Sequence, residues 1–123
     1  MIPSFSKNKE KGYIVESGSN ANGEYIKFSD GTMICYKVTD TIAMNIDIAW
    51  GSMYEGSVDM GQFPANFTET PAISASPFSS GMLVEQAGAN ATQNSWGLVT
   101  AVRPTAVQNV SSRFYLIAIG KWK

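Results

Sequence analysis

The amino-acid sequence predicts an all-β fold, a compact antiparallel β-sandwich, and three observations predict it. Apolar and polar residues alternate strictly over residues 42–50, which is the period of a strand with one face on a core. Two β-rich runs, residues 24–28 and 32–37, flank Asp30-Gly31, a dipeptide typical of a hairpin turn. Further short β-type runs are separated by Gly, Pro, Ser and Asn, and no stretch has the apolar spacing of a helix longer than about ten residues.

The predicted β-sandwich domain covers residues 24–123, and residues 1–23 form a polar, turn-rich lead-in with one short strand at 13–15. We expect the 42–50 strand to be central in the domain, with Trp50 in the core. The remaining strands are predicted at residues 51–60, 71–76, 82–87, 95–103 and 113–122.

For two segments of the predicted domain, a loop and the last strand, the sequence also predicts where the side chains lie. Phe63 and Phe67 belong to a proline-bounded loop, and we expect them to plug the open end of the core. The last strand is apolar on both faces, since residues 116–119 read Leu-Ile-Ala-Ile. Such a strand is central and buried on both sides in an isolated domain, or it presents one face to a neighbouring subunit in an oligomer.

The composition limits the classes of partner. The chain has 123 residues, enough for one domain, and only 15% of them are charged, against about 25% in an average soluble protein. Ser, Thr, Asn and Gln must therefore supply much of the polar surface, as suits an oligomer subunit or a surface that meets sugars. The net charge is −1, and the one basic cluster, residues 7–11, is interrupted by an acid. We therefore expect no nucleic-acid partner.

The single cysteine and the hydropathy of the chain set further limits. Cys35 has no second cysteine with which to form an intrachain disulfide, and we expect it to be a small buried apolar residue. No run approaches the roughly 20 apolar residues of a membrane span, and residues 1–20 lack the apolar segment of a signal peptide. We expect neither membrane insertion nor a signal peptide.

The residue types argue against an enzyme. The absence of histidine excludes Ser-His and Cys-His nucleophile pairs and metal sites built on imidazole. No phosphate-binding glycine loop is present, so we predict no cofactor and no metal. Asp47 and Asp59 are the best candidates for a glycosidase-type carboxylate pair, but solvent-facing strand positions are the preferred interpretation of both.

Binding remains the favoured activity, and we predict a ligand site at the loop end of the sandwich. Trp96 would supply a stacking platform beside Asn94, with Arg103 and Tyr54 as polar partners. For each residue taken singly another interpretation is preferred: most tryptophans of small β-domains are core residues, and a surface ion pair or plain solvation is the favoured state of Arg103.

Three blocks of the sequence resemble C-terminal modules of phage tail-fibre and receptor-binding proteins. Residues 17–35 contain a Gly-rich segment, an aromatic-x-Lys-Phe run, Asp-Gly-Thr and a short apolar strand. Residues 50–71 resemble the aromatic, Phe-Pro and Pro loop that follows in those modules, and residues 117–122, Ile-Ala-Ile-Gly-Lys-Trp, match their ending. The blocks occur in the right order along most of the chain.

These modules are similar in turn to H-type lectin domains, so the resemblance implies an H-type-lectin-like β-sandwich that assembles as a homotrimer. It implies a receptor-binding tip domain in a phage or prophage virion, with other tail proteins and a bacterial cell-surface carbohydrate as partners, made in the host cytoplasm. The alternative is a purely structural fibre or capsid decoration without a ligand. The acidic and histidine sugar contacts of H-type lectins have no counterpart here, since residues 72–78 hold no acid and the chain has no histidine.

Overall fold

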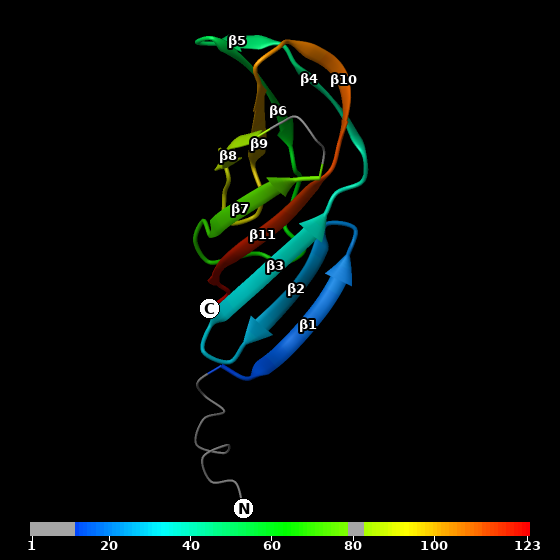
Figure 1. The fold of residues 1–123 in the computed structure, drawn as a ribbon. Coiled ribbons are helices and arrows are strands. Elements are labelled where there is room, and N and C mark those ends of the chain that lie inside the picture. The colour runs from blue at the N-terminus through cyan, green and yellow to red at the C-terminus, as the bar shows by residue number, and fades with distance from the viewer. Residues whose placement is uncertain (1–11, 79–82) are drawn as a thin grey trace, which may run out of the picture.

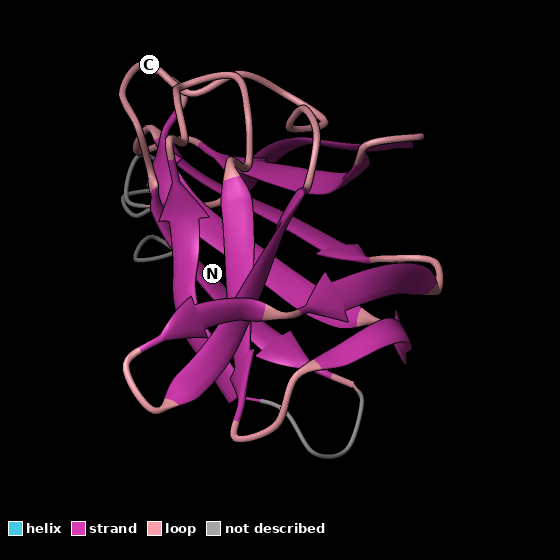
Figure 2. Cartoon of the chain, turned by 90° about the horizontal axis from the view of Figure 1, so that it is seen from above, coloured by secondary structure: helices cyan, strands magenta, loops and turns pink. Residues whose placement is uncertain are grey.

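The computed structural model describes residues 12–78 and 83–123 and contains eleven strands in these ranges, with no helix of the length and hydropathy that crossing a membrane requires. Figures 1 and 2 show strands joined by loops and packed in layers. The strands are β1 (Ile14–Asn20), β2 (Gly23–Phe28), β3 (Thr32–Val38), β4 (Ile42–Ile46), β5 (Ile48–Trp50), β6 (Met53–Asp59), β7 (Ala72–Pro77), β8 (Leu83–Ala89), β9 (Leu98–Arg103), β10 (Val107–Ser112) and β11 (Phe114–Lys121).

All strand pairings are antiparallel among the described residues, and the predicted β-sandwich is confirmed. One sheet has five strands in the order β1-β2-β3-β11-β7, a second has four in the order β5-β6-β9-β8, and β10 pairs with β4. The last strand of the chain, β11, inserts between β3 and β7 (Figure 1).

The core lies between these sheets, because each contributes buried side chains to one cluster. The predicted plug is present: Phe63 and Phe67 are buried and meet edge to face with ring centroids 4.9 Å apart. Cys35 is fully buried, as expected. The buried members of the cluster are Met33, Cys35, Met44, Ile46, Met60, Phe63, Phe67, Trp96, Val99, Ala101, Phe114, Leu116 and Ala118.

The prediction of one central strand at residues 42–50 is wrong. The alternation holds through β4, and then the chain changes partner at Asp47: β4 pairs with β10, whereas β5 pairs with β6. Trp50, expected in the core, is 46% exposed, and Ile48 is exposed as well. Periodicity describes which faces a strand has, but it cannot reveal that the neighbouring strand changes midway.

Two strands differ from the prediction: one is longer than expected and the other was not expected. The short strand expected at 13–15 is the seven-residue β1, which pairs with β2 through an irregular register near Ile14. No strand was predicted at β10, where Val107 and Val110 alternate poorly because a register shift separates them. Asn109 takes a positive φ of 55° within that shift, and its N–H donates to the Asn45 side chain.

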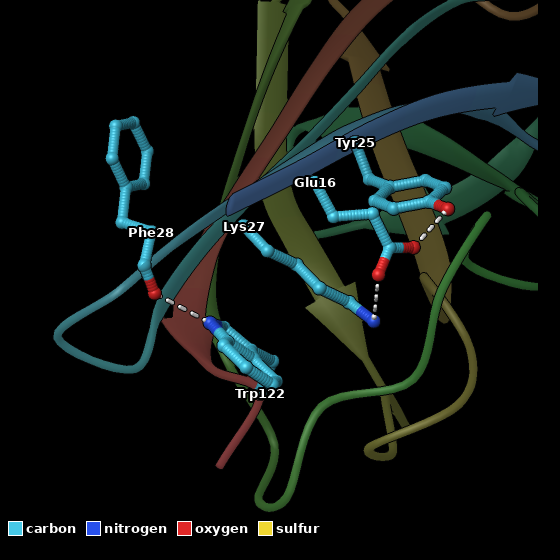
Figure 3. Close-up of polar contacts among 5 residues, drawn as sticks. All are labelled: Glu16, Tyr25, Lys27, Phe28 and Trp122. Carbon is cyan, nitrogen blue, oxygen red and sulfur yellow. Dashed lines mark hydrogen bonds and ion pairs between the residues drawn. The ribbon is translucent and has the colours of Figure 1, made fainter. Parts of the chain in front are cut away.

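A polar and aromatic cluster fastens β1 to β2, as Figure 3 shows. The Tyr25 hydroxyl donates to the Glu16 carboxylate over 2.6 Å, and the Lys27 ammonium lies 3.5 Å from the other carboxylate oxygen. The same ammonium lies 5.2 Å from the centroid of the Trp122 ring, whose indole N–H donates to the Phe28 carbonyl over 2.8 Å. These contacts fix the first two strands and the C-terminal segment against one another.

The buried thiol gives a test of the core. Burial raises the pKa of Cys35 to about 11, and its Sγ lies 4.0 Å from the Ala65 carbonyl oxygen. We therefore expect no reaction with Ellman's reagent in the folded protein at pH 8, and one equivalent of reaction after unfolding in guanidinium chloride. Rapid labelling of the folded protein would show that this part of the core is open.

The Glu16 cluster predicts a pH dependence of stability. The hydrogen bond from Tyr25 holds the pKa of Glu16 below its usual value of 4.5 and raises the pKa of Tyr25. A carboxyl whose pKa is lowered by folding stabilises the protein above its unfolded pKa, and that contribution is lost as the pH falls through the folded pKa. The melting temperature should therefore fall on acidification below about pH 4.5, and less so in Glu16→Gln.

Glu85→Gln, at an exposed position of β8, is the charge-matched control and should keep the wild-type profile. If the melting temperatures of the wild type and Glu16→Gln fall equally as the pH is lowered, Glu16 is not the source of the pH dependence.

Candidate functional site

The four predicted ligand residues do not meet in the structure. Tyr54 and Arg103 are register partners on β6 and β9, at the end of β9 farther along the chain. Asn94 and Trp96 precede the other end of β9, so its six residues, at about 3.3 Å per residue, separate the two pairs. Asn94 and Trp96 were grouped because they are neighbours in the sequence, and the length of β9 holds them apart from Tyr54 and Arg103.

Trp96 is a core residue, which was the preferred interpretation of this side chain taken singly. It is 1% exposed, and its ring centroid lies 4.6 Å from that of Phe63. Among the described residues, its Nε1 is the buried side-chain polar atom without a hydrogen-bond partner. A ring enclosed in this way offers no face to a sugar, whereas Asn94 is exposed and its carbonyl accepts the Phe63 N–H.

The two carboxylates considered for acid–base catalysis are engaged in separate structures. Asp47 lies between β4 and β5 and accepts a hydrogen bond from the Gln108 side chain over 3.2 Å. Asp59 ends β6, and its carboxylate accepts the Gly61 N–H over 2.8 Å, closing a turn. Both are exposed, as the preferred interpretation had them.

A polar cleft of about 530 Å³ opens beside the end of β3 and is called the β3-end cleft below. Its volume lies within the roughly 300–1,000 Å³ of small-molecule sites. The walls come from the β1–β2 turn, the end of β3 with the residues after it, and the end of β6. Its lining is Ser19, Asn20, Ala21, Gly23, Glu24, Tyr36, Lys37, Val38, Thr39, Asp40, Ile42, Asp59 and Met60.

The polar groups of the β3-end cleft are partly fixed by hydrogen bonds. The Lys37 ammonium donates to the Met60 carbonyl over 3.1 Å, and the Asn20 side-chain amide donates to the Pro64 carbonyl over 3.0 Å. The negative charge of Glu24 beside Tyr36 raises the pKa of that phenol. Asp59 was the only lining residue that sequence reasoning had singled out, and for a different role. The cleft is formed by segments that are far apart in the sequence, so no local sequence motif could have predicted it.

A second feature is the part of the outer face of the five-stranded sheet that centres on β11, called the β11 face. Along β11, inward residues are buried while Tyr115, Ile117 and Ile119 are each more than 40% exposed. The register places uncharged residues of β3 and β7 beside them. The β11 face consists of Ile34, Tyr36, Val38, Ala72, Ser74, Ser76, Tyr115, Ile117 and Ile119, none of them charged. Two charged residues border it on the same side of the sheet: Glu24 of β2, the register partner of Tyr36, and Lys121 at the end of β11.

Comparison with known proteins finds a similar fold in two solved structures. No protein-family model matches the chain, and no curated protein matches it. Two solved structures are similar. One is the P. aeruginosa R1 pyocin fibre comprising C-terminal residues 323–701, at a TM-score of 0.50 and 12% identity, with 86% of this chain and 28% of that chain covered.

The other is an N-truncated R1-type pyocin tail fibre, at a TM-score of 0.53 and 11% identity, with 96% of this chain and 95% of that chain covered. The chain thus spans little more than a quarter of the first structure and nearly all of the second. At such low identity the likeness concerns the fold, and the chain shares that fold with R1-type pyocin tail-fibre fragments.

Proposed function

We propose that this chain is a non-catalytic receptor-binding module of a tail fibre, in a phage or phage-like particle, that binds a bacterial surface glycan as a homotrimer. The main support for this proposal is that the chain shares its fold with the N-truncated pyocin tail fibre over nearly the whole of both chains. A tail-fibre module works beside other tail proteins of the particle. The H-type-lectin-like sandwich that the sequence suggests is compatible with this role, since such a scaffold presents loops and clefts to a ligand.

The β11 face supports the trimer. Contiguous exposed apolar surface on a small protein marks an interaction site, and here three aromatic or branched side chains line one strand. The nine residues of the face carry no charge, so copies that meet through them bring no like charges together, and Glu24 and Lys121 lie at its border. Cyclic symmetry would let three copies turn this face toward a common axis, which buries the apolar residues without leaving an open edge.

The trimer is tested by mass in solution. Light scattering should return about three times the 13.3 kDa chain mass at micromolar concentration. Ile117→Glu puts a charge at the centre of the β11 face and should yield monomers with an unchanged circular dichroism spectrum. Ile48→Glu, at an exposed isoleucine on β5 outside that face, is the matched control and should stay trimeric. A wild-type mass near that of one chain would refute the trimer.

Receptor binding is tested by adsorption of the fluorescently labelled protein to a panel of bacterial strains. We expect saturable adsorption to some strains, lost after periodate treatment of the cells because periodate cleaves the vicinal diols of sugars. Protease treatment of the cells should leave it intact. Loss on protease treatment alone would indicate a protein receptor, and absence of saturable adsorption to every strain would favour the purely structural fibre role.

A further inference from the structure

We propose that the β3-end cleft is the glycan-binding site and that it takes uncharged or amino-bearing sugar units while rejecting anionic ones. The inference rests on the proposed function for the ligand being a glycan. The location and the charge preference come from the cleft itself.

The cleft exists because β3 extends beyond its last register pair with β2. The last register pair between β2 and β3 is Glu24–Tyr36, whereas Lys37 and Val38 continue in register with β11 alone. On the β2 side, Gly23 still lies against Tyr36 and Lys37, so the strand edge that no described strand pairs with begins at Val38. Such an edge presents backbone N–H and C=O groups to a ligand.

The wall opposite this edge is held close by a glycine. Gly23 has a φ of +129°, and a Cβ there would lie 2.7 Å from the Tyr36 carbonyl oxygen, so a larger residue would push the β1–β2 turn away. The side chain of Asn20 pins the same turn, because it donates to Pro64 and accepts the Asn22 N–H. The cleft is thus a built feature with two fixed walls.

The side chains of the cleft match the chemistry of a sugar. Glu24, Asp40 and Asp59 are exposed carboxylates, which accept hydrogen bonds from hydroxyl groups, and these charge-assisted bonds are among the stronger ones. The ring of Tyr36, exposed in the single chain, lies on the border strand of the β11 face and supplies an apolar surface next to them, so the proposed trimer must leave the cleft side of this ring uncovered. Polar acceptors beside an aromatic ring suit a molecule that carries vicinal hydroxyls on a weakly apolar ring.

The charge of the cleft selects among glycans. Three carboxylates face one ammonium, that of Lys37, which already donates to the Met60 carbonyl. The resulting negative potential repels phosphate- or uronate-bearing polymers and tolerates neutral or amino sugars. Within the described ranges, no three acidic, histidine or cysteine side chains are grouped closely enough to hold a metal ion.

The cleft also borders the proposed trimer interface. Tyr36 and Val38 belong to both the cleft lining and the β11 face. Three clefts would thus stand around one axis, each beside a neighbouring copy. Weak contacts at each cleft would combine, since multivalent display raises apparent affinity by orders of magnitude.

The test uses the whole chain and a strain to which the wild type adsorbs. The double variant Glu24→Gln/Asp40→Asn keeps the size of both side chains and removes two of the three carboxylates. Adsorption should weaken by at least about tenfold, because each lost charge-assisted hydrogen bond is worth that much. Glu69→Gln, an exposed acid in the loop before β7, is the charge control and should adsorb like the wild type. Light scattering must show all three proteins to be the same oligomer.

A second arm tests the charge preference. Polysaccharide extracted from the same strain is separated by anion exchange into retained and unretained fractions, and each competes with the cells for the labelled protein. Competition by the unretained fraction supports the inference, and competition by the retained fraction alone overturns it. Equal adsorption of the double variant and wild type also overturns it while leaving receptor binding intact. If the wild type adsorbs to no strain, the proposed function itself fails.

Discussion

The insertion of β11 between β3 and β7 is the constraint on which the rest of the structure depends. Its eight residues alternate so that Phe114, Leu116 and Ala118 enter the core while the residues between them face outward. A one-residue slip would exchange the two faces, and because both are apolar the slip is opposed chiefly by packing. This pairing joins segments far apart in the chain: Thr32 pairs with Lys121, 89 positions later, and Val38 pairs with Tyr115, 77 positions later.

The same pairing explains why the two candidate surfaces adjoin. Because β11 stays in register with β3 through Val38, the end of β3 remains ordered beyond the last register pair with β2. That extension makes one wall of the β3-end cleft, and its outward residues continue the β11 face. A shorter β11 would remove both features at once, so the closing strand links the proposed interface to the proposed ligand site.

Local signals in the sequence predicted much of the fold. The Asp30-Gly31 hairpin forms between β2 and β3, Cys35 is buried, and Phe63 and Phe67 fill one end of the core. Each of these depends on neighbouring residues or on hydrophobicity alone. The change of partner at Asp47 and the poorly alternating β10 depend instead on which strands lie side by side, and that information is not local.

Prediction of the ligand site from local sequence signals is limited even more, because a site is formed by segments that are far apart in the sequence. Sequence reasoning paired Trp96 with Asn94 because they are neighbours in the chain. In the fold, however, the Trp96 ring is buried in the core and Asn94 is exposed at the surface. The cleft gathers the β1–β2 turn, the end of β3 and the end of β6, three segments with no shared motif. In a chain with so few charged residues, three acids line one cleft while the nine residues of the adjoining β11 face carry no charge, so charge is segregated between two neighbouring surfaces. In the proposed trimer this segregation serves both roles, since it keeps charge off the contact between copies and concentrates hydrogen-bond acceptors where a glycan would lie.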